Sequence, residues 1–182
     1  MKSSDLTQKE RFKFLVDALE KGKYARIAKA IGVSGTFIYQ IKDGDSPISE
    51  NTLFKMCCTY PLINGEYLMD GKGEPFIEKP TPTTRLREAI KKLDLSTKDV
   101  DSLLGIGTSL DICYNRISIK TISRFLEVHN NINENYILNG TGAIFPTVED
   151  KLMERIGELQ KQIKLLEQTN DLLSKALKQY ER

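Results

Sequence analysis

The sequence predicts an all-α protein with two related helical domains followed by a coiled coil. First, no run of consecutive apolar residues in the 182-residue chain exceeds three, which argues against fully buried parallel strands and against a membrane span. Second, a segment of 14 residues recurs 69 positions later with six identities. Third, a heptad repeat of apolar residues occupies the last thirty or so positions. Two tandem domains and a dimerisation helix follow from these observations.

The repeated segment predicts one short capped helix near the end of each domain. It pairs residues 63–76 with 132–145. Asn64 and Asn133 stand at the N-cap position, and Gly71 and Gly140 stand where a left-handed C-cap is expected. Gly71-Lys-Gly73 lacks the strand, the spacing and the Lys-Ser/Thr pair of a phosphate-binding loop.

Further helices are expected upstream of each repeated segment. Thr7 and Glu10 have the spacing of a capping box, and short helices fit 24–31, 34–42 and 49–58. In the second copy, Ser96 begins a helix. Residues 117–122 alternate like a strand, but their aligned partners 48–53 favour a helix that begins at Ser118.

The domain boundaries are expected at proline-rich segments. Pro80 and Pro82 resist both helix and central strand, so 79–83 is predicted to be a linker. This places a first domain at 1–78, a second at 84–146 and the coiled coil at 147–182.

The C-terminal heptads predict a parallel two-stranded coil. β-branched residues at position a, leucine at position d and one asparagine at a favour a parallel dimer whose register the asparagine sets. The alternative is an ordinary amphipathic helix docked on the globular part, but the apolar stripe is narrower than such helices usually show. The predicted seam consists of Leu152, Ile156, Leu159, Ile163, Leu166, Asn170, Leu173, Leu177 and Tyr180.

Composition points to no enzyme. Cys57, Cys58 and Cys113 are odd in number and two are adjacent, so they are expected to be reduced core residues. His129 has no partner pattern for catalysis. The formal net charge of +2 does not by itself indicate a class of binding partner. We expect no cofactor, no metal, no membrane partner and a cytoplasmic location.

Residues 24–43 resemble the helix-turn-helix of the lambda-repressor-like (phage repressor type) family. The match consists of a small residue at Ala28, a turn glycine at Gly32, and aliphatic residues expected to be buried at Ile27, Ile31, Val33, Ile38 and Ile41. The closing segment from Tyr67 to Gly73 is similar to the Trp-Leu-x-x-Gly-x-Gly ending of many such regulators, with Tyr in place of Trp. The resemblance covers 8–76 well and 84–145 in part. It implies two tandem helix-turn-helix domains, the second degenerate.

The resemblance implies DNA contacts in the first domain. In this family the N-terminal part of the second helix of the motif enters the major groove. Gln40 is the strongest candidate, because its amide can bond adenine N6 and N7 together. Residues 21–42 carry five basic side chains and no acid, which suits phosphate contacts. The expected base contacts are Ser34, Thr36, Tyr39, Gln40 and Asp43, and the expected phosphate contacts are Lys23, Tyr24, Arg26, Lys29 and Lys42.

The second copy departs from the pattern. Asp101 and Asp111 occupy positions that are buried in the family, and the segment before Ile117 is about four residues shorter than its counterpart. We therefore expect a shortened or tilted recognition helix. Thr108, Ser109 and Asn115 remain weaker candidates for base contact, and phosphate contacts remain open for Arg85, Arg87, Lys91 and Lys92.

The expected function is that of a transcriptional regulator, in the first place a repressor. It would bind a two-fold-related operator in double-stranded DNA as a homodimer joined through the coil. The rival is a protein-interaction scaffold or antirepressor that uses degenerate helix-turn-helix domains and the zipper.

Overall fold

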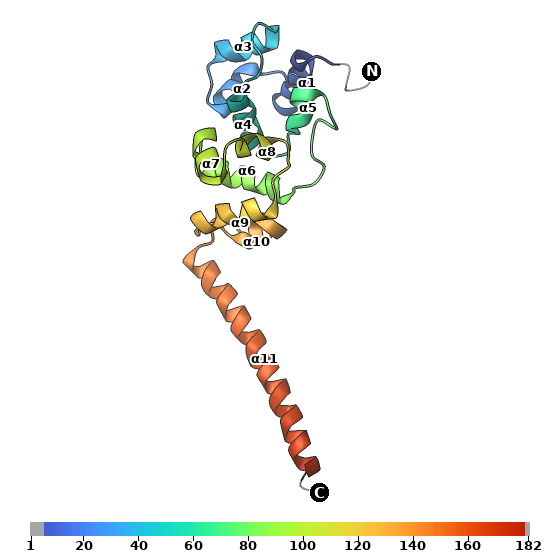
Figure 1. The fold of residues 1–182 in the computed structure, drawn as a ribbon, viewed down its shortest axis with the longest axis vertical. Coiled ribbons are helices and arrows are strands. Elements are labelled where there is room, and N and C mark those ends of the chain that lie inside the picture. Colours follow the sequence, from blue (N-terminus) through green and yellow to red (C-terminus); the bar gives the residue numbers. More distant parts are fainter. Residues whose placement is uncertain (1–5, 181–182) are drawn as a thin grey trace. The chain divides into compact units, whose positions relative to one another are not determined.

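The computed structural model describes residues 6–180, except for the side chains of 154 and 176–180. It is all-helical, and its single isolated β-bridge, between Ile63 and Phe76, belongs to no strand among these residues (Figure 1). The chain forms two compact units: one ends at Ile144 and the other begins at Phe145.

Five helices form the first repeat: α1 (Gln8–Glu20), α2 (Tyr24–Ile31), α3 (Gly35–Asp43), α4 (Glu50–Thr59) and α5 (Gly65–Asp70). The expected caps are present. Thr7 and Glu10 form a reciprocal capping box at α1, Asn64 caps α5, and Gly71 ends α5 in the left-handed conformation. Local chemistry therefore sets most helix ends, and the core collects the apolar faces. That core includes Phe12, Leu15, Val16, Ile27, Ile38, Ile41, Leu53 and Leu68.

The second repeat has the same order of helices: α6 (Pro82–Lys92), α7 (Thr97–Leu104), α8 (Thr108–Cys113), α9 (Ile119–Val128) and α10 (Glu134–Asn139). Ser118 caps α9, so the helical alternative is confirmed over the strand. The predicted linker 79–83 is partly wrong. Thr81 caps α6 and Pro82 is among its first residues, where the missing N–H of proline costs nothing.

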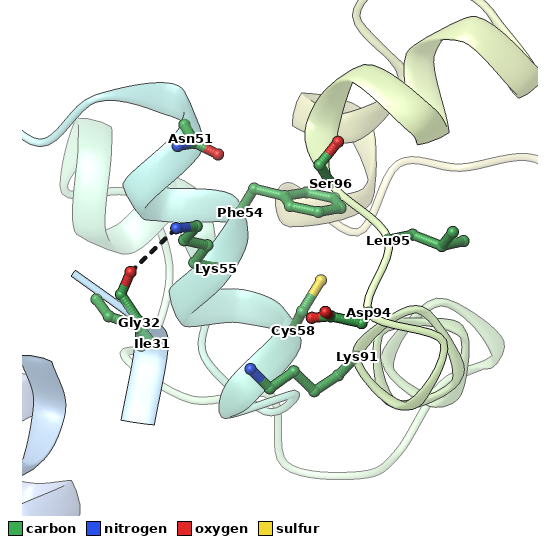
Figure 2. A pocket seen from close by; sticks show the side chains of 10 residues that line it. All are labelled: Ile31, Gly32, Asn51, Phe54, Lys55, Cys58, Lys91, Asp94, Leu95 and Ser96. Carbon is green, nitrogen blue, oxygen red and sulfur yellow. Dashed lines mark hydrogen bonds between the residues drawn. The ribbon is translucent and has the colours of Figure 1, made fainter. Parts of the chain in front are cut away.

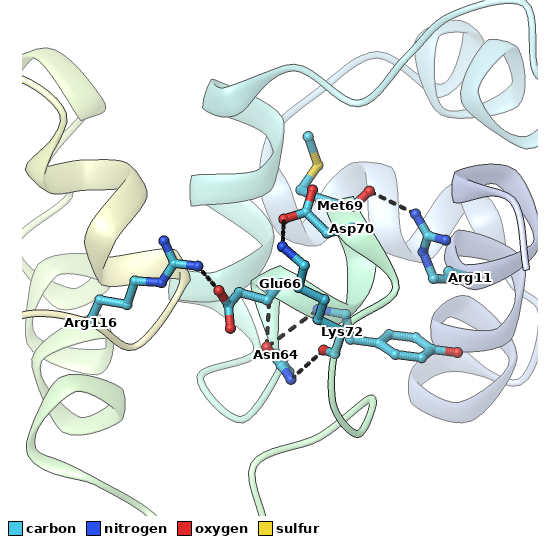
Figure 3. Close-up of polar contacts among 8 residues, drawn as sticks. Arg11, Asn64, Glu66, Met69, Asp70, Lys72 and Arg116 are labelled. Carbon is cyan, nitrogen blue, oxygen red and sulfur yellow. Dashed lines mark hydrogen bonds and ion pairs between the residues drawn. The ribbon is translucent and has the colours of Figure 1, made fainter. Parts of the chain in front are cut away.

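An arginine anchor recurs in both repeats. Arg11 on α1 donates to the carbonyl oxygen of Leu68 at 3.0 Å and to that of Met69 at 2.7 Å, the second of which Figure 3 shows. Arg85 on α6 makes the same pair of bonds to Ile137 and Leu138, at 2.8 and 2.7 Å. Each guanidinium holds the first helix of its repeat against the end of the last one. The repetition of this contact supports a common plan for both halves.

The two repeats pack on one another through unlike surfaces. Helix α4 of the first repeat lies against α6 and α8 of the second. Gly65 is required at this interface, because a Cβ there would lie 2.5 Å from the carbonyl oxygen of Cys113. Figure 3 shows a further contact, an ion pair between Arg116 and Glu66.

Arg87 is the central residue of the interface between the repeats. Its side chain is fully buried, and it forms no ion pair with a carboxylate among the described residues. Its three nitrogens donate five hydrogen bonds of 2.6 to 3.0 Å to backbone carbonyls on both sides, which satisfies every N–H of the guanidinium. The acceptors are the carbonyls of Pro61, Ile63, Ile112 and Cys113. Two of them lie at the C-terminal end of α8, which favours a positive charge.

The three cysteines gather at the same interface. Cys57, Cys58 and Cys113 are buried and free of disulfides, as expected from the sequence. Burial raises the pKa of the Cys58 thiol far above its usual range, so Cys58 stays protonated.

The second unit contains the long helix α11 (Val148–Tyr180). Thr147 and Asp150 exchange hydrogen bonds at its start, in the pattern of a capping box.

Candidate nucleic-acid interface

Helices α2 and α3 are joined by a tight turn at Gly32. This residue ends α2 with φ +65°, a conformation that glycine adopts without strain. Ala28 is 3% exposed and allows the close approach of the two helices, which pack directly on each other. Ile27, Ile31, Ile38 and Ile41 are buried as expected. Val33 was also expected in the core, but it is only half-buried.

Helix α3 presents a polar face on the side opposite to Ile38 and Ile41. The five residues expected to contact bases, Ser34, Thr36, Tyr39, Gln40 and Asp43, are all exposed. Ser34 has a structural role as well, since its hydroxyl accepts a hydrogen bond from the backbone N–H of Phe37 as the N-cap of α3. The side chains of Thr36 and Gln40 take part in no hydrogen bond within the described part of the chain.

The basic side chains around this face are not equally available. Lys23, Arg26 and Lys29 are exposed, and Arg26 lies 3.9 Å from Glu20 in a loose ion pair. Lys42 is partly covered: its ammonium lies 5.5 Å from the ring centre of Tyr24 and 5.4 Å from that of Tyr39. The charge over these two rings fixes Lys42 beside the exposed face of α3.

The tyrosines under Lys42 form a small aromatic cluster. Tyr24 is half-buried, with its ring centre 5.9 Å from Tyr39 and 6.1 Å from Phe12. Desolvation raises the pKa of Tyr24, so its hydroxyl is a neutral hydrogen-bond donor near pH 7.

The second repeat lacks an equivalent surface. Helix α8 has six residues where α3 has nine, which confirms the expected shortening. Its Ser109 is buried and is held by Asp101, which accepts from the backbone N–H at 2.8 Å and from the hydroxyl at 3.2 Å. Asn115 accepts a hydrogen bond from Thr81. Because α8 also packs against α4, Ile112 and Cys113 at its C-terminal end are buried, whereas Asp111 stays exposed.

The expectation of phosphate contacts by Arg85 and Arg87 is wrong. These side chains are 9% and 0% exposed and donate to backbone carbonyls inside the protein. The structural roles of Arg85 and Arg87 were not predicted from the sequence, although the sequence contains one signal for that of Arg85. Arg11 and Arg85 each precede an apolar series with the same spacing, at Phe12, Leu15 and Val16 in one helix and at Leu86, Ala89 and Ile90 in the other. Lys91 and Lys92 are exposed.

Helix α11 presents the predicted seam to solvent. Six apolar members, Leu152, Ile156, Leu159, Ile163, Leu166 and Leu173, are 43% to 63% exposed. Asn170 is exposed between them, while Leu177 and Tyr180 lie outside the residues whose side chains are described. Leu165 and Leu172 are exposed outside the seam.

Comparison with protein families, with curated proteins and with solved structures finds no match. Among the described residues, no helix has the length and apolarity needed to cross a membrane. The same residues contain no group of three or more His, Cys, Asp or Glu side chains arranged to hold a metal ion.

Proposed function

We propose that this protein is a sequence-specific DNA-binding transcriptional regulator of the lambda-repressor-like helix-turn-helix type. The observation that carries the proposal is the α2–turn–α3 unit. A glycine turn and a buried aliphatic set hold α3 with five polar side chains exposed, beside the exposed Lys23, Arg26 and Lys29. A rigid helix with a polar face and flanking cations suits a major groove and its phosphates.

Dimerisation through α11 is the second part of the proposal. The two repeats within one chain meet through unlike surfaces, α4 on one side and α6 with α8 on the other. One chain therefore offers a single exposed α3, and a two-fold-related site needs a second chain. The apolar seam of α11 would supply the two-fold axis as a parallel coil, with Asn170 setting the register.

Selection from a random pool of DNA duplexes tests the proposal. The full chain should enrich an inverted repeat whose two halves are identical. Failure to enrich any sequence at low salt, where phosphate contacts are strongest, would reject DNA recognition.

Two substitutions test the division of roles on α2 and α3. Gln40→Ala should change the preferred base at one position of each half-site, with a loss of about 1–3 kcal/mol for the original base. Lys29→Ala should weaken the affinity for all DNA sequences alike. It should also reduce the slope of log affinity against log salt concentration by about 1, the loss of one phosphate contact. Lys98→Ala on α7 is the matched control, an exposed lysine on the corresponding helix of the second repeat. Equal effects of Lys29→Ala and Lys98→Ala would contradict the assignment.

A protein-binding scaffold or antirepressor is the second candidate, favoured by one observation. The second repeat exposes three large aliphatic side chains, Ile106 at 101%, Ile119 at 65% and Val128 at 56%. Exposed apolar residues of this size are more typical of a protein contact than of DNA. Absence of DNA selection would leave this candidate standing.

A further inference from the structure

A cavity of about 390 Å³ lies at the junction of the two repeats. The first repeat contributes the end of α2 and one side of α4, and the second contributes the corner between α6 and α7 (Figure 2). The cavity therefore exists only because the repeats are docked. Its volume suits a small organic molecule, and boundaries between domains are common places for such sites.

The chemistry of the lining is that of an amphiphilic site. Ile31, Phe54 and Leu95 supply apolar surface, and Figure 2 shows the Phe54 ring extending from α4 toward Ser96. Two lysines line the cavity, Lys55 from the first repeat and Lys91 from the second. In the described part of the chain neither lysine forms an ion pair.

We propose that this cavity binds a small carboxylate with an apolar body. The carboxylate would accept from Lys55 and Lys91, and the apolar body would lie on Phe54 and Leu95. Asp94 is the one acid in the lining, so a ligand with a hydroxyl or amino group could donate to it. Two lysines against one aspartate leave a local charge of +1, which favours an anionic ligand.

The site is linked to the turn before α3. Gly32 is the residue that ends α2, and its carbonyl oxygen accepts a hydrogen bond of 3.2 Å from the ammonium of Lys55 (Figure 2). A bound carboxylate would share the three N–H donors of this ammonium with the Gly32 carbonyl, so ligand binding would act on a side chain that contacts the α2–α3 turn. The consequence for DNA binding rests on the proposed function, whereas the binding itself does not.

The second repeat supplies a matched control. Its counterpart surface is lined by Leu104, Lys120, Thr121, Ser123, Arg124 and Glu127. Arg124 stands 69 positions after Lys55, and Ser123 and Glu127 replace Phe54 and Cys58. This surface keeps two cations, Lys120 and Arg124, but lacks the aromatic ring and any residue from a neighbouring repeat. We expect no ligand there.

Titration of the full chain with benzoate, phenylacetate and hexanoate, followed by amide NMR spectra, tests the proposal. At least one probe should shift the amides of Gly32, Lys55 and Ser96 in a saturable manner. Benzamide, which lacks the charge, should bind about tenfold more weakly than benzoate, as expected for the loss of a charge-assisted hydrogen bond. Shifts that do not saturate, or no shifts with any of the three probes, would overturn the proposal.

Three variants complete the test. Lys55→Met and Lys91→Met keep the aliphatic stem and should each weaken the best probe about tenfold, while their spectra report whether the fold is intact. Arg124→Met should leave the affinity unchanged. Equal losses in all three variants, or none in the two lysine variants, would refute the assignment. DNA affinity with and without the best probe is measured separately, so a failure of DNA recognition is distinguishable from a failure of this site.

Discussion

Removal of the Arg87 guanidinium should destabilise the first unit strongly. Arg87→Met keeps the length of the side chain but leaves the carbonyls of Pro61, Ile63 and Cys113 without this donor, whereas that of Ile112 also accepts from Asn115. An unsatisfied buried polar group costs about 1–3 kcal/mol, so three give about 3–9 kcal/mol. Methionine also removes the desolvation cost of a buried charge, so we expect the lower end of that range, about 3 kcal/mol.

The free energy of unfolding in urea, followed by near-ultraviolet circular dichroism, measures this loss. Six of the seven tyrosines belong to the unit that ends at Ile144, so the signal reports on that unit. The free energy of unfolding of Arg87→Lys should lie between those of the wild type and Arg87→Met, because lysine has three donors and lacks the planar guanidinium.

Arg116→Met is the matched control for Arg87→Met. Arg116 also crosses between the repeats, but its side chain is 52% exposed. Its ion pair with Glu66 should contribute less than about 1 kcal/mol. If Arg87→Met costs no more than Arg116→Met, the argument that Arg87 holds the repeats together is refuted.

Three further outcomes are expected. Gly65→Ala should lower the free energy of unfolding by about 1–3 kcal/mol, because the new Cβ meets the carbonyl of Cys113. Gly35→Ala has open space around its Cβ and should be neutral or stabilising. Equal urea midpoints for the two variants would contradict this. Asn170→Val should raise the stability of the coil by on the order of 1–3 kcal/mol and broaden its distribution of oligomers, and unchanged sedimentation and melting would reject the seam. Bonds from the N-cap lower the pKa of Glu10 from its ordinary 4.5, so its contribution to stability is present above that pH and lost as pH falls through the lowered pKa. The difference in urea midpoint between wild type and Glu10→Gln should therefore shrink in acid, and a constant difference would argue against it.

Local features of the fold were predictable from the sequence because local chemistry sets them. Thr7, Ser96 and Asn133 cap helices in the structure as expected, and Gly140 adopts the expected left-handed conformation. In each case the determining contact spans only a few residues.

The contacts between the repeats could not be predicted in the same way. Arg87 bonds to residues 24 to 26 positions away, on both sides along the chain. Its charge suggested phosphate contact, and only the packing of α4 against α6 and α8 shows that it is enclosed. Lys55 and Lys91 are a second example, because nothing in their spacing along the sequence indicates that they line the same cavity.

The interface between the repeats also bears on whether further copies of the chain could add to the second repeat. Contacts between unlike surfaces have no built-in end, so in principle a further copy from another chain can add to the second repeat as the second adds to the first. Gly65 permits the close approach of the Cys113 carbonyl in the first repeat, and its aligned position in the second is Glu134. A side chain at this position would clash with a backbone that came as close as the Cys113 carbonyl comes to Gly65. The second repeat therefore does not offer a further copy the glycine at which the first repeat admits the Cys113 carbonyl.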